Sequence, residues 1–212
     1  MKDDMKADLV FDFGGVVFNW QPLRLLRETL PESVTDEAQA RSVAAQIFQS
    51  FSLTSDWALF DLGQIDAGPL AERIAKRSGM KEADVLRVIE AVPDHLVPIP
   101  GTVSLLQRLK AQGHRLFFLS NMPKAYALEL ERRNDLAAWF DGGVFSSRLQ
   151  LIKPQPEIFH AAVQRFDLEP AKTVLVDDLV HNIEAARLQG WQGVHFQNPQ
   201  QCGDALDALL LA

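Results

Sequence analysis

Several polar side chains of this 212-residue chain follow short apolar segments. Each segment is rich in β-branched or aromatic residues and is apolar on both faces, as buried parallel strands are. The polar residues at their ends are Asp12, Ser120, Asn121, Asp177 and Asp178, and Lys153 lies between the third and fourth segments. Because the carboxyl ends of parallel strands line one crevice of an open α/β sheet, we expect these side chains to meet there.

The expected crevice combines three carboxylates with an ammonium, a hydroxyl, an amide and the backbone N–H groups of a glycine turn at Gly14 and Gly15. Clustered carboxylates repel one another unless a cation lies among them, and an all-oxygen set suits a hard ion such as Mg²⁺. A magnesium ion, a lysine and N–H donors together stabilise a phosphoryl group. The residue types therefore predict phosphoryl chemistry at this edge of the sheet.

The elements that would position these residues alternate along the chain. Strands are predicted at residues 9–11, 115–119, 143–145, 173–176 and 193–196. Amphipathic helical patterns lie between them: one capped by Thr102 and ending at Gly113, one from Pro156 to Phe166, and one from Ile183 to Leu188. This alternation predicts an α/β fold of three layers around a doubly wound parallel sheet.

Residues 21–92 interrupt this alternation, because their apolar spacing is helical throughout. The helices are predicted at Pro22–Leu30, Asp36–Phe51, Pro69–Ser78 and Lys81–Val92. The return segment, residues 93–101, contains Pro93, Pro98 and Pro100, which are expected to keep it out of a helix interior. We therefore expect an all-helical subdomain at residues 19–95, inserted into an α/β core of residues 1–18 and 96–212.

The composition is that of an ordinary globular protein, with 47% hydrophobic and 23% charged residues. A net charge of -7 without any basic stripe argues against a nucleic-acid partner. Cys202 is the only cysteine, so no intrachain disulfide can form, which indicates a reducing compartment. The acidic start MKDDMKADLV is unlike a signal peptide, and no long apolar run follows it. We therefore expect a cytoplasmic protein with no membrane partner; the oligomeric state is not encoded in any recognisable pattern.

Four motifs, in this order, resemble those of the haloacid dehalogenase superfamily. They are LVFDFGG around Asp12, FLSN around Ser120, LIKPQPEIF around Lys153 and VLVDDLVHNIEAA around Asp177 and Asp178, and they span residues 9–186. Within the superfamily the chain looks most like the bacterial sugar-1-phosphate phosphatases and the phosphatase domain of soluble epoxide hydrolases. The resemblance implies a Rossmann-like core, and it identifies the helical insertion as the family's smaller type of cap.

The resemblance also implies catalytic and binding roles. Asp12 would be the nucleophile and form an aspartyl-phosphate that water then hydrolyses, and Ser120 and Lys153 would complete the catalytic set. The substrate-binding positions would be Phe13, Gly14, Ser120, Asn121 and Lys153. The substrate would be a small phosphorylated metabolite, for example a sugar 1-phosphate.

In the same resemblance, Mg²⁺ is the implied cofactor. It would bind one oxygen of Asp12, the backbone carbonyl of Gly14 and the carboxylate of Asp178. Asp177 would be a second ligand or a partner of the ion through water, and Asn182 would support this loop by hydrogen bonding.

Gly14 departs from the family pattern. Family phosphatases usually carry there a second Asp that acts as general acid and base, and its loss removes a contribution of about 10²–10⁴ to the rate. Three explanations are open. In the first, the leaving group departs without a proton donor, as in an anomeric or acyl phosphate. In the second, the leaving group is a halide, as in the metal-free 2-haloacid dehalogenases. In the third, the chain binds its ligand without catalysing a reaction. Asp177 and Asp178 disfavour the halide explanation, because they would repel a carboxylate substrate.

A different proton donor would also explain Gly14, and His181 or a residue of the cap is the candidate.

Other residues have simpler roles. One of Asp177 and Asp178 is expected to cap the helix that follows. Trp20, Trp57 and Phe60 are expected to pack the helical insertion, with one or two of them lining the substrate pocket.

Overall fold

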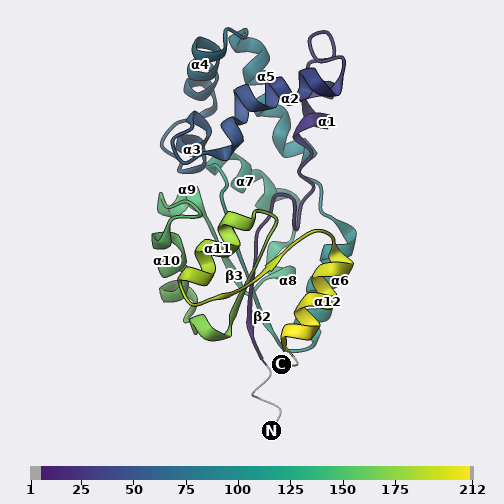
Figure 1. Cartoon of the computed structure of the whole chain (residues 1–212), viewed down its shortest axis with the longest axis vertical. Helices are drawn as coiled ribbons and strands as arrows, with labels where there is room; N and C mark the ends of the chain where they lie inside the picture. Colours follow the sequence, from purple (N-terminus) through teal and green to yellow (C-terminus); the bar gives the residue numbers. More distant parts are fainter. Residues whose placement is uncertain (1–5, 211–212) are drawn as a thin grey trace.

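One parallel sheet organises the chain in the computed structural model, which describes residues 6–210 (Figure 1). Its strands are β1 (Asp8–Phe11), β2 (Arg115–Ser120), β3 (Gly142–Phe145), β4 (Thr173–Asp177) and β5 (Gln192–His195). The strand order is β3-β2-β1-β4-β5, and every neighbouring pair is parallel. The predicted doubly wound parallel sheet is therefore confirmed, with β1 at its centre.

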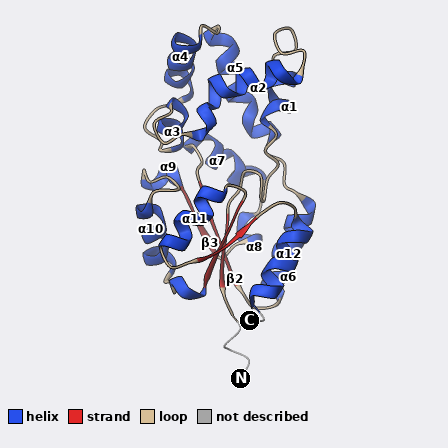
Figure 2. Ribbon diagram, in the orientation of Figure 1, coloured by secondary structure: helices blue, strands red, loops and turns tan. Residues whose placement is uncertain are grey.

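Helices cover both faces of the sheet, so the core has three layers (Figure 2). Leu9 and Phe11 of β1 point into one apolar cluster, which includes residues of α6 (Pro100–Ala111) and α12 (Pro199–Leu210). Val10 points into the other, with residues of α10 (Pro156–Phe166) and α11 (Val180–Leu188). This alternation of side chains along a fully buried strand fixes the register of the sheet between the two helical layers.

The chain between β1 and α6 is helical, and in Figure 1 it forms the end of the molecule beyond the carboxyl edge of the sheet. Its elements are α1 (Pro22–Thr29), α2 (Glu37–Phe48), the 3₁₀ turn η1 (Gln49–Phe51), α3 (Asp56–Asp61), α4 (Ala67–Ser78) and α5 (Glu82–His95). Asp36, expected as the first residue of a helix, is instead the N-cap of α2, because its side chain accepts a hydrogen bond from the Gln39 N–H. The short helix α3 is absent from the sequence-based expectations.

The remaining elements of the core are α7 (Lys124–Arg133), α8 (Leu136–Trp139), α9 (Ser146–Leu149) and η2 (Pro170–Lys172). None of the helices within residues 6–210 is long and apolar enough to cross a membrane. Residues 1–5, which begin the acidic segment noted in the sequence, lie outside the described residues.

Two linkers join the helical insertion to the core, and they are hydrogen-bonded to each other. Phe18 and Pro98 form an antiparallel bridge. On either side of it, the Asn19 N–H donates to the Val97 carbonyl and the Ile99 N–H donates to the Val17 carbonyl, each at 2.8 Å. We propose that this ribbon is the boundary of a cap of residues 19–95, so that the cap enters and leaves the core at one point.

Two expectations at the helix ends are wrong. Thr102 does not cap α6, which begins at Pro100; instead the Thr102 hydroxyl donates to the Val16 carbonyl at 2.8 Å, because the first turn of this helix packs on the loop after β1. Proline at the first helical position is favourable, since its missing N–H has no partner there anyway. The helix α5 continues to His95 and contains Pro93, which was expected to lie outside it.

Pro93 is tolerated because another group replaces its missing hydrogen bond. A proline at position 93 leaves the carbonyl of Ile89, four residues earlier, without its helical donor. The Tyr126 hydroxyl of α7 donates to that carbonyl at 2.6 Å, and Tyr126 is 4% exposed. The Tyr126 side chain therefore connects the last turns of α5 to the core, and helical periodicity in the sequence could not predict this contact.

We expect Tyr126→Phe to lower the free energy of unfolding by about 1–3 kcal/mol, because it leaves the buried Ile89 carbonyl without a donor. Pro93→Ala supplies a backbone N–H that can donate to the same carbonyl. In the Pro93→Ala background the Tyr126→Phe change should therefore cost less than about 1 kcal/mol, as measured by urea unfolding of the four proteins. Equal costs in both backgrounds would show that the two groups do not share this acceptor.

Candidate active site

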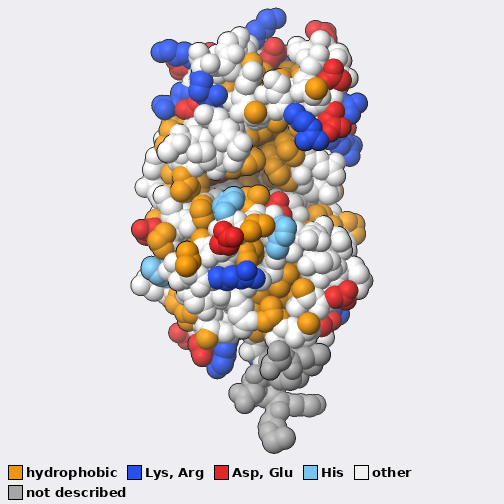
Figure 3. Space-filling model, in the orientation of Figure 1, with side chains coloured by type: hydrophobic (Ala, Val, Ile, Leu, Met, Phe, Trp, Pro, Cys, Tyr) orange, Lys and Arg blue, Asp and Glu red, His pale blue; other side chains and the backbone are white. Residues whose placement is uncertain are grey.

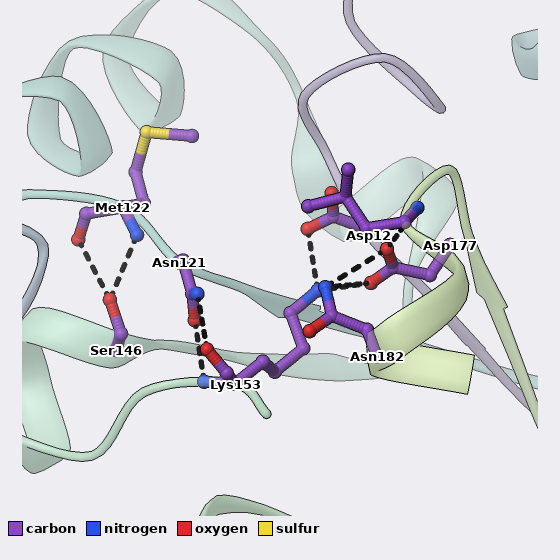
Figure 4. A network of polar contacts seen from close by, with 8 residues as sticks. Asp12, Asn121, Met122, Ser146, Lys153, Asp177 and Asn182 are labelled. Carbon is purple, nitrogen blue, oxygen red and sulfur yellow. Dashed lines mark hydrogen bonds and ion pairs between the residues drawn. The ribbon is translucent and has the colours of Figure 1, made fainter. Parts of the chain in front are cut away.

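A buried lysine joins the ends of β1 and β4. The Lys153 ammonium lies 2.8 Å from Asp12 Oδ1 and 2.6 Å from Asp177 Oδ2, and the lysine is 2% exposed (Figure 4). Asp12 directly follows β1, where its N–H donates to the Val176 carbonyl of β4. The sheet therefore brings together, as expected, three residues that are far apart in the sequence.

The Asn121 side chain fixes the position of Lys153. Its Oδ1 accepts from the Lys153 N–H and its Nδ2 donates to the Lys153 carbonyl, both at 2.9 Å (Figure 4). The next peptide bond, between Lys153 and Pro154, is cis. The resemblance assigned Asn121 a role through its backbone only, so this clamp on the lysine backbone is a function that the sequence did not reveal.

Burial and mutual repulsion shape the charges of the site. Burial, opposed by Lys153 and reinforced by the charge of Asp177, raises the pKa of Asp12 to about 6. Burial raises the pKa of Asp178 to about 7, with Asp12 and Asp177 contributing in the same direction. Burial alone would lower the pKa of Lys153, but the carboxylates of Asp12 and Asp177 more than offset it and raise that pKa. The lysine is therefore charged, but its single positive charge does not keep the pKa of Asp12 and Asp178 at the usual value for aspartate.

The two adjacent acids after β4 have different surroundings. Asp177 is fully buried, and its carboxylate accepts hydrogen bonds from Lys153, from the Leu179 N–H at 2.9 Å and from the Asn182 amide. The expectation that Asp177 or Asp178 caps α11 is wrong, because the N-cap residue is Leu179 and no side chain caps this helix. Asp177 instead accepts from the N–H of Leu179, which lies before the first turn. Asp178 is partly exposed, and within residues 6–210 its carboxylate accepts from its own backbone N–H but from no other side chain.

The donor set fits a small divalent cation. Asp12, Asp177 and Asp178 each place a carboxylate oxygen within 4.8 Å of the other two. Oxygen donors of this kind suit Mg²⁺, which binds through one or two carboxylates and keeps several of its waters. Because the pKa of both Asp12 and Asp178 is raised in the absence of an ion, a bound cation would favour their ionised forms.

The two glycines after Asp12 face different constraints. Gly15 has φ of +79°, and a Cβ there would lie 2.6 Å from Asp178 Oδ2, so only glycine fits. Gly14 has no positive φ, and a Cβ there would meet only Trp20, at an ordinary 3.9 Å from its Cβ. The backbone at position 14 therefore has room for a side chain, and the acid that the family pattern leads one to expect is not sterically excluded.

Two of the expected site residues are less accessible than the others. Ser120 ends β2 at 1% exposure and does not line the pocket around Asp12. The Phe13 ring is fully buried, with ring centroids 4.6 Å from Phe118 and 4.9 Å from Phe18. Any contact of Phe13 with a substrate would therefore be made by its backbone.

A cavity of about 150 Å³ lies above Asp12, between the core and the helical insertion. Gly14, Asn121, Lys153, Asp178 and Asn182 line its base with Asp12. Trp20 and Trp57 line its walls, whereas Phe60 packs against the Trp57 and Tyr126 rings, so two of the three expected aromatic residues reach the pocket. His181 is exposed and does not line it. Figure 3 shows hydrophobic side chains gathered in the hollow between the two ends of the molecule.

One carboxyl in the cavity wall has no counterpart in the sequence-based expectations. Asp61, the last residue of α3, is 6% exposed and lines the same cavity as Asp12. Burial raises its pKa well above the usual range, and the charge of Asp12 adds to this effect. A buried acid on a helix of apolar spacing is the signal that could have found it, but α3 itself was not predicted.

Comparison with known proteins agrees with these features. A family model described as haloacid dehalogenase-like hydrolase matches residues 9–190. The sesquiterpene phosphatase astK of Aspergillus oryzae is 27% identical over 188 residues, which cover 88% of each protein. The phosphorylated carbohydrates phosphatase of Thermotoga maritima is 24% identical over 192 residues, which cover 88% of this chain and 83% of that protein. A crystal structure of a Bacteroides thetaiotaomicron enzyme of the same family, in complex with magnesium and inorganic phosphate, shares the fold, with a TM-score of 0.70 at 20% identity over 91% of this chain and 94% of the other.

We expect Asp178→Asn to stabilise the cation-free protein at about pH 8 and to have little effect at about pH 4. The pKa of Asp178 is raised from 3.8 to about 7 on folding, so its ionisation opposes folding as the pH rises between these values. The gap in Tm at the higher pH should be at least about 2 °C. Excess Mg²⁺ should reverse the order, because it would bind the wild type better. Identical Tm profiles for the two proteins would contradict this account.

Proposed function

The chain belongs to the haloacid dehalogenase-like hydrolases, and we propose that it is an Mg²⁺-dependent phosphatase of a small phosphorylated metabolite. The observation that carries this proposal is the buried ion pair of Lys153 with Asp12 at the base of one cavity, within a cluster of three carboxylates. A carboxylate nucleophile, a fixed ammonium and a cation site are the groups that phosphoryl transfer requires. The phosphatase names of the two sequence relatives support the same reaction.

Asp12, the Gly14 carbonyl and Asp178 would hold the magnesium ion in this proposal, with Asp177 acting on it from further away. The hydrogen bonds of Asp177 support this division, because Lys153, Leu179 and Asn182 already engage its oxygens, whereas the Asp178 carboxylate is free to bind. When bound, the ion would neutralise charge on the phosphoryl oxygens.

The chain's own residues would then carry out the reaction in two steps. Asp12 attacks phosphorus and forms an aspartyl-phosphate, and water hydrolyses this intermediate. Lys153 holds the Asp12 carboxylate in place and balances the charge that gathers on the phosphoryl group. Ser120 and the Asn121 backbone would bind phosphoryl oxygens, while the cap limits access of water. The cap would open about the ribbon formed by Phe18 and Pro98 to admit substrate, and would then close to exclude water from the site.

The experiment is a panel assay of phosphate monoesters with Mg²⁺, repeated with chelator, beside 2-haloacids without metal. We expect turnover of at least one phosphate ester that disappears when the chelator is added. Release of halide in the presence of chelator would instead support the metal-free dehalogenase, and no turnover of any compound would support a binding protein.

Asp12→Asn should abolish this phosphatase turnover, because the amide cannot form the covalent intermediate. The matched control is Asp8→Asn at the opposite end of the same strand, where Asp8 pairs with Arg115. That change should leave kcat and KM within about twofold, because the Asp8 carboxylate lies outside the cavity and its loss acts only on a partly exposed ion pair. Turnover by Asp12→Asn close to that of the wild type would reject Asp12 as the nucleophile.

A further inference from the structure

The walls of the cavity above Asp12 are apolar. The cap contributes Trp57 and Ala58 from α3 and Val92 and Leu96 from the end of α5, and the core contributes Met122 and Ile152. All of these side chains are at most 6% exposed. They surround the space where the group attached to the phosphate would lie, since the base of the cavity holds Asp12 and Lys153.

Most of the polar groups near these walls already have hydrogen-bond partners. The Tyr126 hydroxyl donates to the Ile89 carbonyl, so this residue offers only its ring to the cavity. The Asn121 amide is held by the backbone of Lys153, and the Asn182 Nδ2 donates to Asp177. The Asn182 Oδ1 is buried without a hydrogen-bond partner among residues 6–210, so it offers a substrate one acceptor. Apart from the indole N–H groups, the only polar side chain that the cap adds to the wall is Asp61. A sugar would bury several hydroxyls here without partners, which selects strongly against it.

We infer that the substrate is the phosphate monoester of a small apolar alcohol rather than a sugar phosphate. This inference rests on the phosphatase function proposed above. A cavity of about 150 Å³ with apolar walls can admit a group the size of a benzene ring. The walls would gain from burying such a group, because every CH₂ removed from water favours binding.

The test compares cyclohexylmethyl phosphate with glucose 6-phosphate, in the presence of Mg²⁺. Both present a six-membered ring on a primary phosphate ester, so they differ chiefly in ring polarity. We expect kcat/KM to be at least about 10²-fold higher for the apolar ester. Equal or better turnover of glucose 6-phosphate would overturn the inference and leave the phosphatase function intact. No turnover of either ester or of 4-nitrophenyl phosphate would instead contradict the phosphatase function itself.

A pair of valines on α5 tests whether the walls set this preference. Val92→Thr places a hydroxyl in the cavity wall with little change of shape, and should lower the preference for the apolar ester by about 3- to 10-fold. Val85→Thr is the matched control, because Val85 is equally buried on the same helix but does not line the cavity. An unchanged preference in Val92→Thr, or the same change in both variants, would contradict a role for the wall.

A second and independent observation concerns Asp61. No hydrogen bond or ion pair joins its carboxyl to another side chain within residues 6–210, although it is 6% exposed. Its position is nevertheless fixed, because its backbone carbonyl accepts from Ser146 Oγ at 2.5 Å. Ser146 in turn accepts from the Met122 N–H at 2.8 Å, so the end of α3 is tied to the strand ends β2 and β3 (Figure 4).

Gly63 allows this close approach of the cap to the core. It has φ of +68°, and a Cβ there would lie 3.0 Å from the Ser147 carbonyl oxygen. The structure therefore holds the Asp61 carboxyl in place in the wall of the cavity that Asp12 also lines. Burial, together with the charge of Asp12, raises the pKa of Asp61 well above the usual range, so this carboxyl keeps its proton where ordinary acids have lost theirs.

We propose that Asp61 is the proton donor that replaces the missing acid at Gly14. As Asp12 attacks phosphorus, the bond from phosphorus to the ester oxygen breaks, and its electron pair stays on that oxygen. The oxygen takes the proton of the Asp61 carboxyl and leaves as the neutral alcohol. In the second step the Asp61 carboxylate accepts a proton from the water that attacks phosphorus, and the bond between phosphorus and Asp12 breaks.

The test measures kcat/KM of wild type and Asp61→Asn for phosphate esters whose leaving groups range from nitrophenols to primary alcohols. The wild type should depend weakly on leaving-group basicity. In Asp61→Asn, the primary alkyl esters should lose about 10²–10⁴ in rate and the nitrophenyl ester less than about 10-fold. A uniform loss across the series, or no loss, would overturn the proposal, and Tm distinguishes a folding defect.

A rescue variant separates proton donation from a structural role. Gly14→Asp in the Asp61→Asn background places an acid two residues after the nucleophile, where the added Cβ meets only Trp20. It should restore at least about 10-fold of the lost rate on alkyl esters and leave the nitrophenyl ester almost unchanged. If the second acid restored every ester equally or none, the lost function would not be proton transfer.

Discussion

The buried contact of Lys153 with Asp12 and Asp177 holds the residues of the candidate site together at the carboxyl edge of the sheet. It fixes the carboxyl ends of β1 and β4 and the loop after α9 relative to one another. Removing one member of such a buried group leaves an uncompensated charge, which typically costs about 3–5 kcal/mol. The Asn121 clamp and the Asn182 amide serve the same contact, because one holds the lysine backbone and the other holds Asp177. The order of the sheet strands brings all these groups to one edge.

The charges around this contact would suit the proposed divalent cation. Asp12, Asp177 and Asp178 carry three negative charges when ionised, and Lys153 supplies one positive charge. The difference of two is the charge of a divalent cation. Burial, with repulsion among the acids added to it, raises the pKa of Asp12 and of Asp178. The Asp177 carboxylate is held in place by its hydrogen bonds. The core therefore supplies charge and the cap supplies an apolar enclosure, with Asp61 as the exception.

The sequence was informative where the pattern is local. Buried strands read as apolar runs, so the parallel sheet and the meeting of Asp12, Lys153 and the paired acids at its edge were predictable. It was not informative where a distant group decides the outcome. Pro93 lies inside α5 because Tyr126 satisfies Ile89, and no rule of local spacing contains that contact. The role proposed for Asp61 could not be predicted either, because it follows from the cavity that this residue lines and not from its neighbours in the sequence.

The ribbon that joins Phe18 to Pro98 has an evolutionary consequence. Because the chain leaves the core and returns to it side by side, everything between the two linkers can be exchanged for another segment without disturbing the order of the sheet strands. Asp12, Lys153 and the paired acids would keep their positions on the core, while the inserted segment would supply new cavity walls. A chain built in this way can acquire new substrates by recombination at two neighbouring positions, and laboratory grafting can use the same junction.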